Sequence, residues 1–445
     1  METMKRIVLF GAGKSAYTLV SYLVKQAEEN AWVFTIADLN ASAWAKLYKT
    51  PSVKLVDFNI ENEALKNTLI EQSDLVISML PARFHPQIAQ SCLKFSKNLI
   101  TPSYVSPEMK AMDEEARSKG LLFLNELGLD PGIDHMSAMK IINRVKAEDG
   151  QIEGFESFTG GLIAPESDNN PWHYKLTWNP RNVILAGQGG AVKFLHNGKY
   201  KYIPYNKLFD RTEMIHIDGY GDFEGYANRD SLKYIDLYGL QGVKTMYRGT
   251  FRRPHFCKAW HILVQIGATD DSYVMEDSEN MSYRDFINTF LKYRESDSVE
   301  IKLAYYLGID VDGDEMRLLA WAGLFEKKMI GLKMATPAQI LQKLFEEKWA
   351  LEEGDKDMIV MRHLLNYTLN GTKKRIESSM VVIGDDENNT AMAKTVGLPI
   401  GIAAKHILQG NIKAKGVCLP MEANIYEPIL KELEDYGIHF VEKES

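Results

Sequence analysis

Residues 5–16, KRIVLFGAGKSA, constrain the fold more than any other stretch of the chain. The apolar run IVLF at residues 7–10 is typical of a parallel β-strand covered on both faces. Small residues follow it at the spacing G-x-G-x-x-A, at Gly11, Gly13 and Ala16. In dinucleotide-binding folds these positions give a tight turn, room for a pyrophosphate beside the backbone, and close packing of the next helix. We therefore predict a dinucleotide site that also includes Lys14 and Ser15.

A second strand-like run, residues 32–37, ends at Asp38. A carboxylate at this position would accept hydrogen bonds from both ribose hydroxyls and would repel a 2′-phosphate. The sequence therefore predicts NAD rather than NADP as the preferred cofactor. The alternative interpretation is a glycine-rich turn without a ligand and a solvated Asp38.

Composition excludes several classes of partner. The chain has 445 residues, a net charge of −8 and 45% hydrophobic residues, which suits two or three globular domains. It has no long basic run, so we expect neither nucleic acid nor an anionic membrane as a partner. The three cysteines lie far apart and form neither a disulfide framework nor a zinc motif. No apolar run reaches 18 residues. We expect a cytoplasmic protein without a metal.

The first part of the chain alternates strand-like and helix-like runs. Strands are predicted at residues 53–58, 74–80, 97–101 and 121–125, with helices at 41–48 and 65–71. This alternation predicts an α/β fold with a Rossmann-like, doubly wound parallel sheet, in which ligands lie at the carboxyl ends of the strands. Ser78, Met79 and Leu80 end one of these strands, so they either border the cofactor or simply terminate the strand.

Two polar, proline-containing loops follow the last two of these strands, at residues 102–107 and 128–135. Asp130 could cap the helix that continues to about residue 145, face a substrate, or do both, and Asp134 competes for the capping role. We interpret His135 as a structural histidine at the start of this helix rather than as a catalyst.

A second domain begins near residue 150, where longer strand-like runs replace the alternation. Its arginines lie among glycine, tyrosine and asparagine, where guanidinium groups either capture carboxylates or serve the structure. They are Arg229, Arg248, Arg252 and Arg253.

Residues 283–370 are predicted to be a helical lobe that Gly371 closes. Thr390 is predicted to cap a helix rich in small residues, which suits close packing. We therefore place residues 1–130 in a dinucleotide-binding domain joined by about 385–445, and 131–384 in a substrate-binding and dimerisation domain.

The motifs resemble, in order, those of the saccharopine dehydrogenase family, and within it the glutamate-forming enzymes. They are GAGKSA, SML-P, SY-x-SP, NELGLDPGIDH, GG-x-x-APE, FEGYANRDSL, RGTFR and KTVGLPIGIAAKHIL. The resemblance implies a Rossmann-like domain, a mixed α/β domain that binds substrate and dimerises, and a helical lobe. It also implies reversible oxidation of saccharopine to 2-aminoadipate 6-semialdehyde and glutamate in lysine metabolism, by hydride transfer to NAD or NADP.

The resemblance also implies the site residues. Substrate would contact Ser103, Tyr104, Asp130, Arg229, Thr250, Phe251 and Arg252, and the cofactor would also contact Leu129, Asp130 and Asn179. Saccharopine has three carboxylates, which the arginines suit, and Asp130 and Tyr104 are the candidates for acid–base catalysis. The cleft between the two domains is the expected place of hydride transfer. Two departures stand out: Thr159 replaces a cysteine that is frequent in the family, and Asp38-Leu39-Asn40 replaces the arginine that fungal relatives carry there.

Two other functions are consistent with parts of the sequence. A related amine dehydrogenase, such as carboxynorspermidine dehydrogenase or lysine 6-dehydrogenase, would share the cofactor domain but not the need for several arginines. A regulator that senses a dinucleotide without turnover would need the glycine turn alone. We expect a small-molecule substrate and a homodimer.

Overall fold

The computed structural model describes residues 4–48, 50–294 and 296–445. The chain divides into two compact units. Unit 1 comprises Met1–Asp149 and Met380–Val441, and unit 2 comprises Gly150–Ser379 and Glu442–Ser445. The first domain was predicted to end at residue 130, whereas unit 1 also includes the helix after it, α6 (Ile133–Ala147), because α6 packs on α15 (Ala423–Glu434).

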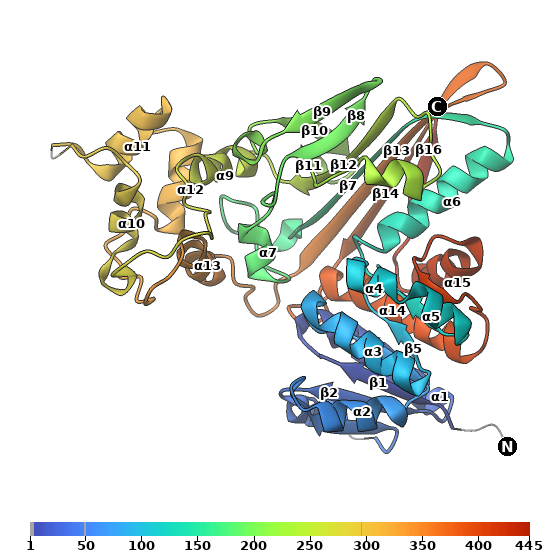
Figure 1. The fold of residues 1–445 in the computed structure, drawn as a ribbon. Coiled ribbons are helices and arrows are strands. Elements are labelled where there is room, and N and C mark those ends of the chain that lie inside the picture. Colours follow the sequence, from blue (N-terminus) through green and yellow to red (C-terminus); the bar gives the residue numbers. More distant parts are fainter. Residues whose placement is uncertain (1–3, 49, 295) are drawn as a thin grey trace. The chain divides into compact units, whose positions relative to one another are not determined.

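Unit 1 is built on a seven-stranded sheet with the order β15-β6-β5-β4-β1-β2-β3, in which every pair of neighbours is parallel. Figure 1 labels β1, β2 and β5 of this sheet. The order 3-2-1-4-5-6 within it is that of doubly wound dinucleotide-binding folds, and it reverses between β1 and β4. The predicted parallel sheet is therefore confirmed, and the place for a ligand is the carboxyl end of these two strands. The strands are β1 (Arg6–Phe10), β2 (Val33–Asp38), β3 (Val53–Asp57), β4 (Leu75–Ser78), β5 (Asn98–Ile100), β6 (Leu122–Leu124) and β15 (Gly416–Cys418).

Helices connect these strands. The segment predicted as a helix at residues 41–48 is instead a 3-10 helix over Ala41–Lys46, in which Trp44 is buried against Tyr17. The remaining helices of the first segment are α1 (Tyr17–Glu29), α2 (Glu63–Glu71), α3 (His85–Phe95), α4 (Pro107–Ala111) and α5 (Asp113–Ser118). No helix in the described part of the chain is long and apolar enough to cross a membrane.

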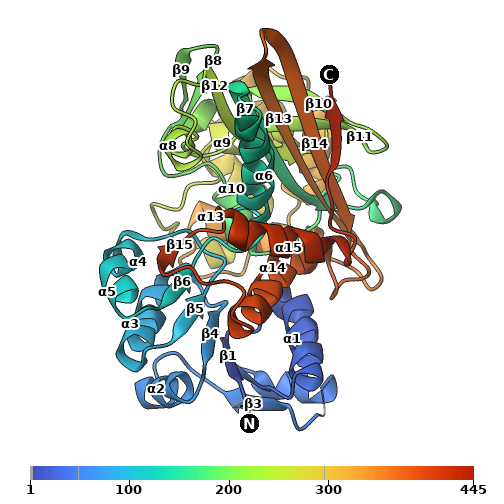
Figure 2. The ribbon, with the colours of Figure 1, turned by 90° about the vertical axis from the view of Figure 1, so that its right-hand side faces the viewer.

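Helix α14 (Ala391–Leu408) lies directly against α1, and Figure 2 shows the two side by side. A Cβ added at Gly397 would lie 2.8 Å from the backbone nitrogen of Leu19, and one at Gly401 would lie 2.6 Å from the ring of Tyr22. These two glycines therefore permit the contact. Thr390 caps α14 as predicted, since its hydroxyl accepts a hydrogen bond of 2.9 Å from the Ala393 N–H.

Unit 2 contains a mixed sheet of nine strands. Seven of them follow the order β10-β11-β12-β7-β13-β14-β16, and β8 pairs with both β12 and β9. Strands β12 and β7 are parallel, whereas β11 and β13 run antiparallel to their neighbours β12 and β7. The strands are β7 (Gln151–Ile163), β8 (Val192–His196), β9 (Lys199–Ile203), β10 (Thr212–Ile217), β11 (Gly221–Ala227), β12 (Thr245–Arg252), β13 (Asp357–Leu369), β14 (Thr372–Ile383) and β16 (Val441–Glu444).

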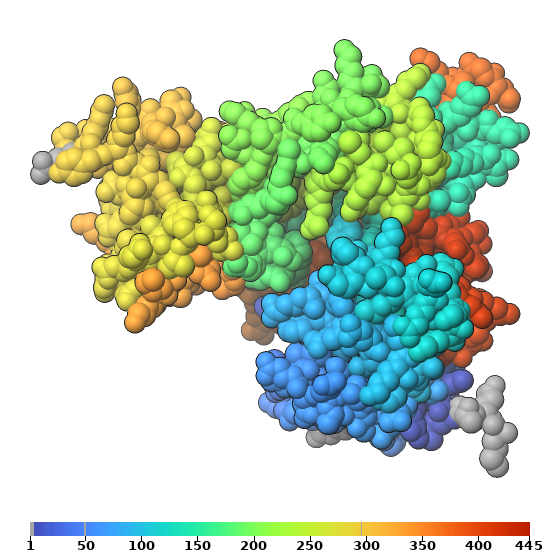
Figure 3. Space-filling view, in the orientation of Figure 1, coloured from blue at the N-terminus to red at the C-terminus, as the bar shows by residue number. Residues whose placement is uncertain are grey.

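The helices between residues 283 and 348 gather at one end of unit 2, where Figure 3 shows them in yellow to orange. The prediction of helices as far as residue 370 was wrong, because Asp357–Leu369 is strand β13 and pairs along its length with β7. Gly371, with φ of +78°, lies in the turn between β13 and β14 instead of ending a helix. The helices of unit 2 are α7 (Pro180–Ile184), α8 (Lys233–Leu237), α9 (Phe256–Gln265), α10 (Tyr283–Thr289), α11 (Val299–Leu307), α12 (Asp314–Ala322) and α13 (Pro337–Lys348).

The contact between α14 and α1 gives a test of the fold. Gly397→Val would place three carbons where backbone and Cβ of Leu19 already lie, within 3.0 Å of the added Cβ. We expect a loss of about 1–3 kcal/mol in the free energy of unfolding, measured by urea denaturation. Gln409→Ala, at the exposed end of the same helix, should change it by less than about 0.5 kcal/mol. Equal effects of the two substitutions would show that the helices do not meet at Gly397.

Candidate active site

The glycine turn after β1 is shaped by its missing side chains. Gly11 has φ of +85°, and a Cβ there would lie 3.1 Å from the backbone of both Met79 and Leu80. Only glycine therefore lets the turn approach the end of β4 this closely. A Cβ at Gly13 would meet no described atom within 4 Å, so the turn is open at that residue. Ala16 is 1% exposed and ends the 3-10 helix Lys14–Ala16 that leads into α1. The open turn fits a diphosphate.

Asp38 is held beside this turn by two backbone groups. Its Oδ2 accepts a hydrogen bond of 2.7 Å from the Ala12 N–H, and its Oδ1 accepts one of 2.9 Å from the Asn40 N–H. The carboxylate is half-buried at the end of β2, so it is fixed where an acidic residue meets the ribose of a dinucleotide.

A buried histidine, His85, links the ends of β4 and β5. Its Nδ1 lies 2.9 Å from the Ser78 hydroxyl, and its Nε2 lies 2.8 Å from the hydroxyl of Ser103 and 2.9 Å from that of Thr101. Burial lowers the pKa of His85 to about 4, so the imidazole is neutral at physiological pH. The local sequence pattern did not predict a role for His85. Its position at the start of a helix that follows a strand end was the available signal.

Tyr104 and Asp130 lie on the two loops that follow β5 and β6, and the structure brings them together. The Tyr104 hydroxyl donates a hydrogen bond of 3.2 Å to Asp130 Oδ1. The alternative interpretation, that Asp130 caps the next helix, was wrong: the residue before α6 is Gly132, whose N–H donates to Asp134 Oδ1 over 2.6 Å. Leu129, beside Asp130, is 6% exposed.

A second histidine fixes these two loops. His135 is fully buried in the first turn of α6, and its Nε2 lies 2.9 Å from Glu126 Oε2. The other oxygen of Glu126 accepts a hydrogen bond of 3.0 Å from the Val105 N–H, next to Tyr104. His135 is therefore structural, as predicted, and Glu126 is a supporting residue that the sequence analysis did not identify.

In unit 2, Arg252 is a buried cation surrounded by aromatic rings. It is 5% exposed, and its guanidinium carbon lies 5.0 Å from the ring centre of Tyr174 and 5.2 Å from that of Phe256. One amino group donates to the Phe251 carbonyl over 2.8 Å, whereas Nε has no hydrogen-bond partner. Within the described residues no carboxylate forms an ion pair with Arg252.

The nearest acidic candidate does not neutralise this charge. Glu224 lies opposite Arg252 in the pairing of β11 with β12, but its oxygens accept the N–H groups of His255 and Cys257, over 3.1 and 3.0 Å. A buried guanidinium without an acidic partner is costly, and an anionic ligand would remove that cost.

The other predicted residues of unit 2 lie in different environments. Thr250 is half-buried and lies opposite Thr159 in the register of β12 and β7, where the Thr159 hydroxyl is buried without a partner. The Phe251 ring packs instead on Phe158, at 5.3 Å between ring centres, and belongs to the core of the opposite face. Arg229 is exposed in the loop after β11 with φ of +50°. Asn179 is exposed and caps α7, accepting a hydrogen bond from the Arg181 N–H over 3.0 Å.

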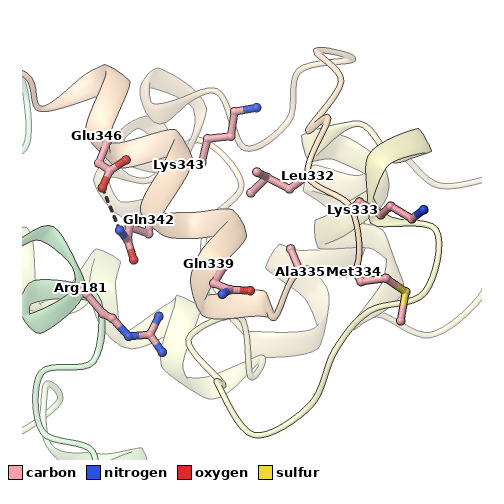
Figure 4. A pocket seen from close by; sticks show the side chains of 9 residues that line it. All are labelled: Arg181, Leu332, Lys333, Met334, Ala335, Gln339, Gln342, Lys343 and Glu346. Carbon is pink, nitrogen blue, oxygen red and sulfur yellow. Dashed lines mark hydrogen bonds between the residues drawn. The ribbon is translucent and has the colours of Figure 1, made fainter. Parts of the chain in front are cut away.

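A cavity of about 530 Å³ lies elsewhere in unit 2, along α13. Figure 4 shows Arg181 extending toward α13, where Gln342 donates to Glu346 over 2.8 Å. Two of the cations that line the cavity have protein partners: Arg181 forms an ion pair with Asp271, and Lys343 donates to the Ile330 carbonyl over 2.6 Å. None of the predicted site residues lines it.

His85 predicts a specific dependence of stability on pH. Below pH 6.5 the unfolded chain binds a proton at this imidazole, and the native protein does not until about pH 4, so the free energy of unfolding falls as the pH falls through this window. Protonation of His85 should lower the free energy of unfolding by about 2.5 kcal/mol at pH 4.5. His85→Gln, which cannot be protonated, should lack this component in urea denaturation between pH 7.5 and 4.5. Parallel curves for the two proteins would contradict it.

Comparison with known proteins shows which family the chain resembles. A saccharopine dehydrogenase NADP binding domain matches residues 7–124, and a saccharopine dehydrogenase C-terminal domain matches residues 128–438. The saccharopine dehydrogenase [NADP(+), L-glutamate-forming] of Schizosaccharomyces pombe is 32% identical over 451 residues, which are 99% of each chain. The mitochondrial alpha-aminoadipic semialdehyde synthase of Bos taurus is 31% identical over 99% of this chain, which spans 48% of that longer protein.

Solved structures agree with the sequence comparisons. The apo saccharopine dehydrogenase (L-Glu forming) of Saccharomyces cerevisiae superposes with a TM-score of 0.88 at 30% identity, over 99% of this chain and 100% of that one. A homospermidine synthase from Legionella pneumophila shares the fold alone, with a TM-score of 0.54 at 12% identity. The chain therefore belongs to the saccharopine dehydrogenase family, whose nicotinamide-binding domain it carries.

Proposed function

We propose that this protein is an L-glutamate-forming saccharopine dehydrogenase, which interconverts saccharopine with 2-aminoadipate 6-semialdehyde and glutamate. The observation that carries the proposal is Arg252, a guanidinium that is 5% exposed and pairs with no described carboxylate. Its surroundings of tyrosine and phenylalanine are dry, so an incoming carboxylate would be bound strongly there. Full-length similarity to enzymes named for this reaction supports the same conclusion.

The substrate's charges suit the residues available. Saccharopine carries three carboxylates, and Arg252 would bind one of them from within an aromatic enclosure. Arg229, which is exposed, is the second proposed anchor. Thr250, on the same face of β12 as Arg252, offers a hydroxyl to a further oxygen. Holding the substrate at several points fixes the reacting carbon, and such positioning supplies much of the rate in a hydride transfer.

The proton steps fall to Asp130 and Tyr104. A nicotinamide cofactor held at the turn of Gly11 and Gly13 and at Asp38 would supply the hydride acceptor for the substrate carbon that carries the secondary amine. That nitrogen loses a proton, and the Asp130 carboxylate is the proposed acceptor, with the hydrogen bond from the Tyr104 hydroxyl orienting it. Water then adds to the substrate imine, and the carbon–nitrogen bond breaks to release the aldehyde and glutamate. The same pair would return a proton to the leaving nitrogen.

Assays separate this proposal from its rivals. NADH or NADPH should be oxidised with 2-aminoadipate 6-semialdehyde plus glutamate. Turnover with the semialdehyde plus a diamine instead would indicate a carboxynorspermidine-type dehydrogenase, and turnover of free lysine would indicate a lysine 6-dehydrogenase. Binding of the dinucleotide without any turnover would indicate a regulator.

Arg252 provides a direct test of the substrate class. Arg252→Gln should lower kcat/KM for saccharopine by about 30- to 1000-fold, because losing a buried charged contact costs about 2–4 kcal/mol. Arg253→Gln is the matched control, since Arg253 donates to the Tyr220 carbonyl over 2.7 Å, and it should change kcat/KM by less than about threefold. The Kd for the dinucleotide, from fluorescence titration, should stay the same in both. Equal losses in both variants would contradict a carboxylate site at Arg252.

Asp38 leads us to propose NAD as the preferred cofactor, although the fungal relatives are named for NADP(+). The fixed carboxylate would face the extra phosphate of NADPH, so kcat/KM should be higher with NADH. Asp38→Ser should lower the ratio of kcat/KM with NADH to kcat/KM with NADPH by about tenfold or more, since one repulsive contact of this kind is worth about 1.4 kcal/mol. Asp38→Asn keeps the shape and should narrow it in the same direction. A higher kcat/KM with NADPH in the unmodified protein would overturn this preference.

A further inference from the structure

The hydroxyl groups around His85 outnumber its ring nitrogens, so more than one arrangement of hydrogen bonds is possible. Three hydroxyls surround two ring nitrogens: Ser78 at Nδ1, and Thr101 and Ser103 at Nε2, all within 2.9 Å. A neutral imidazole has one N–H donor and one acceptor nitrogen. The choice of the nitrogen that carries the proton therefore fixes which hydroxyls donate and which accept.

Ser103 connects this buried cluster to the loop of Tyr104. Ser78 and Thr101 are 0% and 1% exposed, so their hydroxyls are enclosed. Ser103 is half-buried, and its carbonyl accepts the N–H of Glu126 over 3.1 Å, which fixes its backbone. Its hydroxyl is therefore the one group that has both a bond to His85 and a partly open side.

The two tautomers give Ser103 opposite properties. With the proton on Nε2, the ring's single Nε2 hydrogen is shared by the oxygens of Ser103 and Thr101, and the Ser103 hydroxyl hydrogen can then point outward to a carboxylate. With the proton on Nδ1, the ring donates to Ser78, and Ser103 donates inward to Nε2. Its oxygen then presents lone pairs outward, which suit an ammonium or amine.

We propose that His85 is a positioning residue, which sets the direction of the Ser103 hydroxyl toward the amino-acid end of the substrate. This inference rests on the proposed function. It assigns the Nε2-protonated form to a bound carboxylate, because Nδ1 can then accept the enclosed Ser78 hydroxyl. His85 thereby acts through Ser103, which the family resemblance suggests as a substrate contact, without itself contacting the substrate.

Two substitutions of His85 distinguish the roles of its ring nitrogens Nδ1 and Nε2. The amide of glutamine reaches the place of Nε2, whereas that of asparagine ends near Nδ1. His85→Gln should therefore keep kcat/KM for saccharopine within about threefold of the unmodified protein. His85→Asn should lower it by about tenfold, through KM, with the dinucleotide Kd within twofold. Thermal denaturation of both variants checks that they are folded. Equal losses in the two, or a loss that appears only in dinucleotide affinity, would overturn the proposal.

A double-mutant cycle tests the link to Ser103. Ser103→Ala alone should lower kcat/KM for saccharopine by about tenfold. The double variant Ser103→Ala with His85→Asn should lower kcat/KM no further than either substitution alone. Ser91→Ala is the control on α3, the helix that begins with His85, because the Ser91 hydroxyl donates to Asn67 over 2.9 Å. It should change kcat/KM by less than twofold, whether residue 85 is His or Asn. Multiplicative losses for Ser103 and His85 would show independent roles.

A readout without turnover distinguishes this inference from the proposed function. In protein labelled with ¹⁵N-histidine, the ring signals of His85, assigned with His85→Gln, report the tautomer. Ser103→Ala should shift the balance between the Nδ1-H and Nε2-H forms. If saccharopine gives no turnover but this shift occurs, the function fails and the coupling stands. If turnover occurs without the shift, the coupling fails alone.

Discussion

Unit 1 depends on the close approach between the glycine turn after β1 and the end of β4. Because Gly11 has no Cβ, its backbone lies within contact distance of residues 79 and 80, and this is where the strand order reverses. The approach brings three chain segments to one edge of the sheet: the open turn at Gly13, the fixed Asp38, and the strand end at Ser78. A larger residue at position 11 would be strained at φ of +85° and would press on the end of β4.

Buried polar groups then decide how the loops beyond that edge are held. His85 contacts hydroxyls at the end of β4 and in the loop after β5, and His135 with Glu126 joins that loop to the one that carries Asp130. A half-satisfied network of this kind would be costly in the interior, so both networks must form completely in the folded protein. Precise placement of Tyr104 and Asp130 is the result. In unit 2, by contrast, Arg252 has no acidic partner among the described residues, and its guanidinium packs against aromatic rings instead.

The sequence allowed much of this to be predicted where the signal was local. The apolar run before Gly11, the glycine spacing and the strand–helix alternation led to the correct sheet, and Thr390 was correctly predicted as a helix cap. The failures have a common cause. Residues 357–369 contain two apolar runs, at residues 358–361 and 364–365, separated by Arg362 and His363. Short apolar runs of this kind suit a helix or a central strand, and only pairing with β7 selects the strand. His85 and Glu126 acquire their roles from partners on other strands, which no local pattern reveals. Arg252 was predicted from its motif, but its burial and its lack of a partner come from the sheet and from α9.

The two histidines show why residue type alone is a poor guide to chemistry. His135 contacts a carboxylate and stabilises the start of a helix, so its proton is part of a fixed support. His85 contacts only hydroxyls, each of which can donate or accept, and burial keeps its ring neutral by lowering its pKa. A neutral ring among hydroxyls can exchange its donor and acceptor nitrogens without creating a buried charge, whereas a ring bound to a carboxylate cannot release its donor without leaving that carboxylate unpaired. Of the two, therefore, only His85 can adapt the site to a bound substrate at small energetic cost.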